Sequence, residues 1–259
     1  MPNQIIVFIF GLLIGSFLNC LIFRVKQKED ITKRSYCPKC VTQIAWYDNI
    51  PVLSFILLRG RCRKCRSKIS IQYPLVELIT AILFLISFSL NSQKFINLDW
   101  EFLVLIFRDF FIIGVMIFIF IYDLRWYLIP DIISLPACLI IFILNFFSHP
   151  SWFDIGVCAI IGTGFFLIQF LISQGKWIGG GDIRLGLLMG IIFSTQGIDF
   201  LILAILFGYF IGSIIGIALI LAGKKKMGSQ LPLGVFLSIS TLIILFYGER
   251  ILEWYFSLI

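Results

Sequence analysis

Long apolar runs alternate with short polar stretches along almost the whole chain. A helix that crosses a membrane needs about 20 mostly apolar residues, and most of these runs approach that length. They predict eight spans at residues 5–23, 74–90, 102–122, 129–147, 154–173, 183–193, 198–222 and 231–247. The sixth run is too short to cross unaided and follows three glycines, a pattern typical of membrane segments that line a site. We therefore expect an all-α polytopic membrane protein of about eight transmembrane helices.

One polar segment, residues 24–73, interrupts the apolar pattern. It carries twelve Lys or Arg and only three acids. If the N-terminus lies outside, the inside loops and their edges hold 18 of the 21 Lys and Arg, as expected of loops that stay cytoplasmic. We therefore expect three parts: a first transmembrane helix at 1–23, a cytoplasmic loop domain at 24–73 and a seven-helix membrane core at 74–259.

Composition narrows the class of protein further. The chain is 60% hydrophobic and 14% charged, whereas soluble domains are about 45–50% apolar and about 25% charged. The mean hydropathy of +1.03 excludes an ordinary soluble enzyme, a disordered protein and a nucleic-acid-binding domain. The net charge of +7 comes from the cytoplasmic loop, where topology and contact with anionic lipid explain it better than a nucleic-acid partner.

Four of the seven cysteines form two C-x2-C pairs in this loop, separated by 21 residues. The pairs are Cys37 with Cys40 and Cys62 with Cys65. Cytoplasmic cysteines stay reduced, and Zn²⁺ favours four thiolates in a tetrahedron. We expect one structural zinc ion that stabilises the loop. The alternatives are four free cysteines or a redox pair.

Two acids stand at predicted cytoplasmic edges of spans. Asp123 ends the third span, and Asp182 begins the sixth, directly after the glycines at 179–181. Two carboxylates that share a proton can activate water and protonate a leaving amine, and glycines allow a peptide backbone to approach closely. The alternatives are a helix N-cap for Asp182 and a solvated loop acid paired with Arg125 for Asp123.

Other acids in or beside the spans have simpler interpretations. We expect Asp109 to form a local charge pair with Arg108 or to lie at the membrane interface. Asp131 complements the start of the fourth span, and Asp154 caps the fifth. Glu77 lies near the start of the second span, where a charged group is costly and tends to be functional.

Four stretches of the chain, 11–19, 37–77, 123–131 and 179–182, carry motifs that resemble one family. The first is similar to an opening G-S-F-L-N motif, the second to a cysteine-bearing cytoplasmic loop, the third to a first aspartate motif and the fourth to G-x-G-D. Together they resemble the type IV prepilin peptidases, the GxGD membrane aspartic proteases, over nearly the whole chain.

The resemblance implies that Asp123 and Asp182 are the catalytic pair. It implies cleavage of short basic leaders from prepilins or pseudopilins, typically between Gly and Phe, at the cytoplasmic face of the bacterial inner membrane. It also implies N-methylation of the new N-terminal residue by S-adenosylmethionine. Arg184 stands where the family usually has lysine, which retains the charge but changes the donor geometry. The supporting residues we expect are Gly179, Gly181, Arg184, Asp131 and Glu77.

Two alternatives belong to other functional classes. The first is a non-catalytic membrane scaffold whose zinc module binds a pilus or secretion partner. The second is a metal or ion transporter. A transporter would place acids near the middle of its spans, whereas Asp123 and Asp182 lie at one predicted edge.

Overall fold

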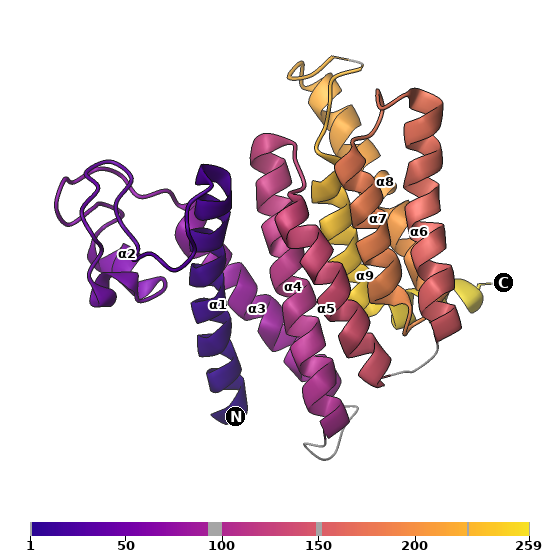
Figure 1. Ribbon diagram of the computed structural model, residues 1–259, viewed down its shortest axis with the longest axis horizontal. Coiled ribbons are helices and arrows are strands. Elements are labelled where there is room, and N and C mark those ends of the chain that lie inside the picture. The colour runs from indigo at the N-terminus through magenta and orange to yellow at the C-terminus, as the bar shows by residue number, and fades with distance from the viewer. Residues whose placement is uncertain (1, 93–99, 149–151, 227, 259) are drawn as a thin grey trace. The chain divides into compact units, whose positions relative to one another are not determined.

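The computed structural model describes residues 2–92, 100–148, 152–226 and 228–258, and these residues form helices and loops without a β-strand. Two isolated β-bridges occur in the polar loop. The chain divides into two compact units, Met1–Ile96 and Asn97–Ile259, which Figure 1 draws in the indigo-to-purple and magenta-to-yellow parts of its colour range. The all-α fold expected from the apolar runs is confirmed.

Unit 1 pairs two apolar helices and carries the polar loop between them. Its elements are α1 (Pro2–Gln27), the 3-10 helix η1 (Trp46–Asn49), α2 (Leu53–Leu57) and α3 (Gln72–Ser92). Glycines let α1 approach α3: a Cβ at Gly11 would lie 2.5 Å from Ala81 Cα, and one at Gly15 would lie 2.6 Å from Glu77 Cα. Helix α3 thus packs with α1 in unit 1, whereas the expected division at residue 74 placed it in the membrane core.

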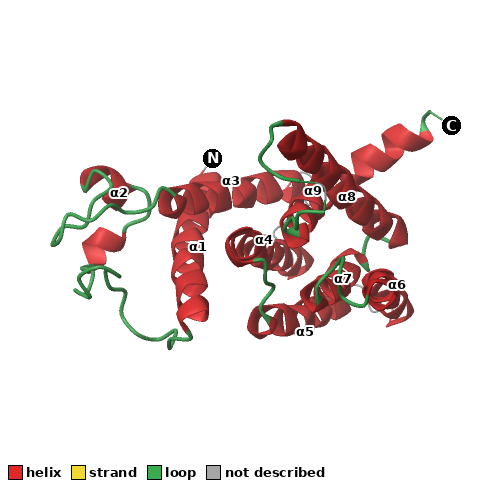
Figure 2. Cartoon of the chain, turned by 90° about the horizontal axis from the view of Figure 1, so that it is seen from above, coloured by secondary structure: helices red, strands yellow, loops and turns green. Residues whose placement is uncertain are grey.

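Unit 2 is a bundle built around a short central helix. Its elements are α4 (Trp100–Trp126), α5 (Asp131–Ser148), α6 (Trp152–Ser173), α7 (Gly180–Phe193), α8 (Ile198–Leu221) and α9 (Leu233–Phe256). Helix α7 packs most closely against α6 and α5, as the view in Figure 2 shows, and Leu185, Leu188 and Phe193 are fully buried. Close packing with α6 depends on small residues, because a Cβ at Gly186 would lie 2.4 Å from Gly162 O.

Six described helices are long and apolar enough to cross a membrane: α1, α3, α4, α6, α8 and α9. Together they support a multi-pass membrane protein. Helix α5 is apolar but shorter, and α7 has 14 residues, about 21 Å at 1.5 Å per residue. All eight expected segments are therefore helical, while the expectation that eight of them cross the membrane stays a prediction.

Candidate active site and metal centre

Asp123 lies in the last turns of α4, where its carboxylate meets the start of α9. The residue is 5% exposed, and its Oδ2 accepts a hydrogen bond from the Val235 backbone N–H at 3.1 Å. The first N–H groups of a helix have no partner within it and favour an anionic group. Arg125 instead lies over the Trp126 ring, 5.8 Å from its centroid. The alternative of a solvated acid paired with Arg125 is therefore wrong.

Asp182 lies in the first turn of α7. Gly179 is the N-cap, and the Asp182 side chain reaches back so that its Oδ2 accepts the Gly179 N–H at 2.9 Å. Asp182 is thus the third residue of the helix rather than its N-cap, although it does satisfy one of the free N–H groups there. Both acids therefore sit at the positive ends of helix dipoles.

Ile129, in the connection from α4 to α5, links the surroundings of the two acids. It is 8% exposed. A Cβ at Gly181, next to Asp182, would lie 3.0 Å from Ile129 Cβ, and a Cβ at Gly234 would lie 3.1 Å from Ile129 Cδ1. Segments 59 residues apart in the chain thus bring both acids to one end of unit 2.

The glycines at this end of unit 2 differ in whether a larger residue would fit in their place. A Cβ at Gly234 would lie 2.9 Å from Asp123 Oδ2, so only glycine leaves the carboxylate in place. Gly181 is similarly restricted by Ile129. By contrast, a Cβ at Gly180 would meet no atom within 4 Å, and one at Gly179 would meet Asp182 Oδ2 only at 3.7 Å. Open space therefore lies beside the start of α7, where a peptide backbone can approach.

Arg184 and Asp131, two of the supporting residues, pair with one another. Arg184 Nη1 forms an ion pair with Asp131 Oδ1, which joins α7 to α5 across two partly exposed side chains. Asp131 also begins α5, as its expected role at a helix start requires. Glu77 lies in unit 1, where its Oε2 accepts the Val52 N–H at 2.7 Å. This hydrogen bond connects Glu77 to the polar loop.

Three neighbours of the acids were missed by sequence reasoning: Ile129, Gly234 and Tyr209. Tyr209 donates a hydrogen bond to Gln169 Oε1 at 2.9 Å. It also lines an open, almost wholly apolar groove of about 370 Å³ between α8 and the start of α9, with Gly212, Gly216, Leu231, Leu233 and Phe236. The available sequence signal was Pro-Leu-Gly-Val at 232–235, a Pro and Gly directly before an apolar run at a predicted cytoplasmic edge.

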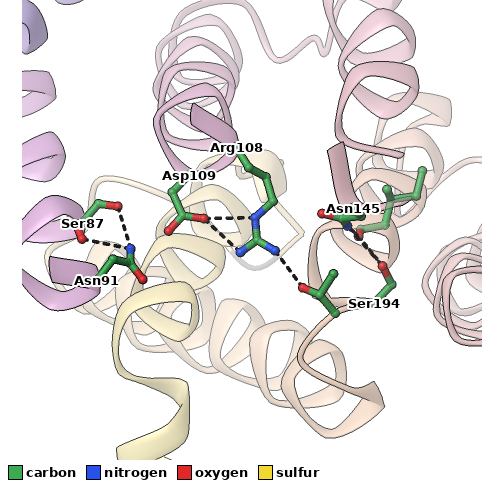
Figure 3. A network of polar contacts seen from close by, with 8 residues as sticks. Ser87, Asn91, Arg108, Asp109, Asn145 and Ser194 are labelled. Atoms are coloured by element: carbon green, nitrogen blue, oxygen red, sulfur yellow. Dashed lines mark hydrogen bonds and ion pairs between the residues drawn. The ribbon is translucent and has the colours of Figure 1, made fainter. Parts of the chain in front are cut away.

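A separate polar cluster lies where α7 ends and the turn to α8 begins (Figure 3). Arg108 Nε and Nη2 donate to Asp109 Oδ1 at 3.1 and 2.9 Å, and its Nη1 donates to Thr195 Oγ1 at 2.8 Å. Asn145 Nδ2 donates to Ile191 O at 2.6 Å, near the end of α7. The expected local pair of Asp109 with Arg108 is confirmed, and it is a buried pair.

The four loop cysteines converge in unit 1. Their sulfur atoms all lie within 4.8 Å of one another, and those of Cys37 and Cys65 are 3.9 Å apart. Four sulfurs placed 2.3 Å from one tetrahedral ion lie about 3.8 Å apart, so the cluster could hold a metal ion. The second pair repeats the first: the Cys37 N–H donates to Thr42 O, and the Cys62 N–H donates to Ser67 O.

The chemical state of Cys37 also fits a metal ligand. Burial acts to raise the pKa of its thiol, but the N–H groups of Cys40 and Lys39 and the side chains of Cys40 and Ser67 outweigh burial and lower the pKa to about 6. The thiolate, rather than the thiol, is the form that binds metal. In the structure all four cysteines are free thiols, so the loop is not closed by a disulfide.

Comparison with known proteins finds related sequences over both units of the chain. Residues 9–90 match the family model described as "Bacterial Peptidase A24 N-terminal domain", and residues 110–221 match "Type IV leader peptidase family". The protein named "Prepilin leader peptidase/N-methyltransferase" from Aeromonas salmonicida (strain A449) is 30% identical, covering 98% of this chain and 94% of that protein. The protein of the same name from Bacillus subtilis (strain 168) is 30% identical, covering 98% of each chain. No solved structure shows a significant match.

The fold and the paired acids define a multi-pass membrane protein with a candidate acid–base site at one end of its helical bundle. The matches to the whole length of the relatives then identify the family. The chain belongs to the type IV prepilin peptidases and is an enzyme of that family.

Proposed function

We propose that this enzyme is an aspartic endopeptidase that removes the basic leader from type IV prepilins or pseudopilins, with Asp123 and Asp182 as its catalytic pair. One observation carries the proposal: two acids from distant segments lie at one end of unit 2, Asp123 buried and Asp182 partly exposed, and each accepts a backbone N–H. Neither forms an ion pair with any residue that the structure describes. Their oxygens are therefore free to exchange protons with water and substrate.

The proposed chemistry needs one ionised and one protonated carboxyl group. Two neighbouring carboxylates do not ionise together easily and share a proton. The ionised group removes a proton from water as the water oxygen attacks the scissile carbonyl carbon. The protonated group donates its proton to the leaving amine when the C–N bond breaks. The pair then holds one proton again, so a complete turnover needs no other acid or base.

The surroundings of the pair suit a peptide that enters a membrane. The open space at Gly179 and Gly180 admits an extended backbone beside Asp182. The apolar groove that begins at Tyr209 and reaches Leu233 suits the apolar segment that follows the leader in such substrates. The charge of the predicted inside loops favours a site that faces the cytoplasm at the bacterial inner membrane, in a bundle of eight crossings. The leader would then be cut where it meets the bilayer.

Two cofactors complete the proposal. Cys37, Cys40, Cys62 and Cys65 would hold one Zn²⁺, and four thiolates leave no open position on the ion, so its role is structural. S-adenosylmethionine would supply the methyl group for the new N-terminal amine, as the name of the relatives suggests. Chemically, the new amine must be unprotonated to accept the methyl group.

The test of the catalytic pair is Asp123→Asn and Asp182→Asn in the full chain, incubated with a prepilin and labelled S-adenosylmethionine. Mass spectrometry should show cleavage reduced by about 10²–10⁴-fold, the usual contribution of acid–base groups. Asn is nearly isosteric, so melting temperatures should stay close to that of the unchanged protein. Methylation of a supplied, already cleaved pilin should persist if its site is separate. Substantial cleavage by folded Asp182→Asn protein would instead favour the scaffold alternative.

The zinc proposal predicts about one zinc atom per chain by elemental analysis. Cys37→Ser should lower the zinc content and disorder the loop, because one of four ligands is lost. Cys20→Ser, which changes a cysteine in α1 outside the cluster, should retain the metal. A folded loop in protein that contains no metal would contradict the proposal.

A further inference from the structure

The polar loop of unit 1 exposes large apolar side chains and buries almost nothing. Of residues 38–71, all described, none is buried. Trp46, Ile56 and Leu57 are 79%, 63% and 71% exposed, and Tyr47 and Leu53 about half. These five residues, from η1 and α2, are referred to below as the loop apolar surface. Exposed apolar patches of this kind mark a surface that binds a partner or a membrane.

The position of this surface relative to α3 indicates its partner. Val52, directly before α2, donates its N–H to Glu77 Oε2 at 2.7 Å. Glu77 lies four residues after Tyr73, whose carbonyl oxygen accepts a hydrogen bond from Asn19 at 3.0 Å. Four residues of helix advance about 6 Å. Because a helical side chain leans toward the N-terminus of its helix, α2 begins beside the first turns of the apolar span 72–92 rather than beyond its end, and Figure 1 shows the loop alongside α1.

The connection that holds α2 at this depth is fixed and strained. Val52 has φ 60° and ψ −49°, a positive-φ conformation that a β-branched residue rarely adopts. Strain of this kind persists only where the surrounding structure enforces it. Here the buried Glu77 carboxylate holds the Val52 N–H and so places α2. Side chains of α1 and α3 near this level are about half exposed, as expected for residues that face lipid. They are Phe17, Leu75 and Ile79.

Positive charge follows the loop apolar surface directly. Residues 59–68 contain six exposed cations: Arg59, Arg61, Arg63, Lys64, Arg66 and Lys68. Asp48, the one acid among residues 31–76, is already paired with Arg63 at 2.7 Å. An excess of cations beside exposed aromatic and aliphatic groups is the composition that binds anionic membrane surfaces.

We propose that the loop apolar surface inserts into the cytoplasmic leaflet beside α1 and α3, while the cations at 59–68 bind anionic headgroups. Interfacial segments bury their apolar face about 5–10 Å into the boundary between headgroups and acyl chains, which agrees with the depth set by Glu77. Trp46 and Tyr47 are the residue types enriched at that boundary. The lipid contact then holds the two cysteine turns at the membrane surface, and it does not depend on the proposed proteolysis.

The test places a photo-crosslinking benzophenone amino acid at Leu57 in the full chain, and at Gln43 as the matched control. Gln43 is exposed in the same loop but pairs with Tyr36, whose ring contacts Phe23 near the end of α1. The proteins are placed in nanodiscs of phosphatidylcholine alone or mixed equally with phosphatidylglycerol. Mass spectrometry after illumination should find lipid adducts at least about five-fold more frequent at position 57 than at 43.

In the mixed nanodiscs, phosphatidylglycerol should exceed its half share among the adducts at position 57. Adding Arg61→Gln and Lys64→Gln should remove that excess while the lipid adducts remain. The same probe at Ile56 repeats the measurement if the Leu57 protein does not fold. Adducts that join position 57 to residues 100–258 or to a bound prepilin, or lipid adducts equal at 57 and 43, would overturn the proposal.

Discussion

Unit 2 places acidic side chains at both ends of α7, in opposite surroundings. Near the end of α7, the Asp109 carboxylate accepts two N–H groups from Arg108, and both side chains are at most 5% exposed. At the start of α7, Asp123 and Asp182 accept backbone N–H groups, and no described cation pairs with either. Carboxylates thus lie at both ends of α7, but only the one near its end has a neutralising cation among the described residues.

The difference distinguishes a structural acid, Asp109, from the two acids that we propose to be reactive. The Arg108 guanidinium occupies an Asp109 oxygen and also donates to Thr195, so the pair connects α4 to the turn after α7, which is a structural role. Helix N-termini stabilise negative charge more weakly and leave carboxylate oxygens available. Burial alone therefore does not identify a catalytic acid in this chain. The proposed distinction rests on the hydrogen-bond partners of each acid instead.

The largest effect we predict from this comparison is on stability at the Arg108 end. Asp109→Asn leaves the buried Arg108 charge uncompensated, and breaking such a pair typically costs about 3–5 kcal/mol. Thermal unfolding in detergent should show a markedly lower melting temperature. Cleavage per folded molecule should change little, because the site lies at the other end of α7.

The control for this prediction is Asp154→Asn, in the first turn of α6, where the side chain is exposed. We expect its melting temperature to stay close to that of the unchanged protein, as is usual for surface substitutions. If Asp109→Asn kept normal stability but lost cleavage, the comparison would be wrong. The reactive acid would then lie at the Arg108 end of α7.

The sequence predicts the helices of unit 2 well because apolar length alone specifies a membrane helix. It also places Asp123 and Asp182 at one depth, since charge asymmetry sets the topology. It does not predict that Asp123 meets the start of α9, because that contact joins residues 112 positions apart. Periodicity describes one helix at a time and contains no information on which helix ends converge.

The next largest effect concerns the contact that sequence reasoning missed. Gly234→Ala would place a Cβ 2.9 Å from Asp123 Oδ2, which forces the carboxylate to move. A displacement of about 1 Å in a catalytic group can cost about 10²-fold in rate, so we expect kcat to fall by about 10–100-fold. The fold should persist, because alanine favours a helix more than glycine does.

Gly180→Ala is the matched control, since a Cβ there meets no atom within 4 Å. Its kcat should stay within about three-fold of that of the unchanged enzyme, and KM is measured separately to detect contact with substrate. Equal kcat losses in both variants would show that the start of α7, rather than the position of Asp123, limits the reaction.

The polar loop shows a second limit of sequence reasoning. The two C-x2-C pairs predict that four sulfurs converge, because metal-binding spacing is local and chemically specific. The second turn repeats the hydrogen bonds of the first, and residues 37–44 and 62–69 share the pattern C-x-K-C-x-(Thr or Ser)-x-Ile. Sequence reasoning did not use this short repeat. The placement of α2 beside Glu77 likewise depends on Val52 adopting φ 60°, a conformation for which a valine gives no sequence signal.

The smallest effect we predict is at the ion pair of Arg184 with Asp131. Unlike the buried pair of Arg108 with Asp109, this pair is exposed to water. Both side chains are 39% or more exposed, and surface pairs contribute about 0–1 kcal/mol. Arg184→Lys and Asp131→Asn should each change cleavage rates by less than about five-fold and melting temperatures only slightly.

A double-mutant cycle with Arg184→Gln measures the pair directly and should give a small coupling energy. If Arg184→Gln lowered cleavage about 100-fold while Asp131→Asn did not, the pair would be incidental. Arg184 would then act on the substrate or on Asp182, and the contrast between acids with and without a cation would no longer explain the site.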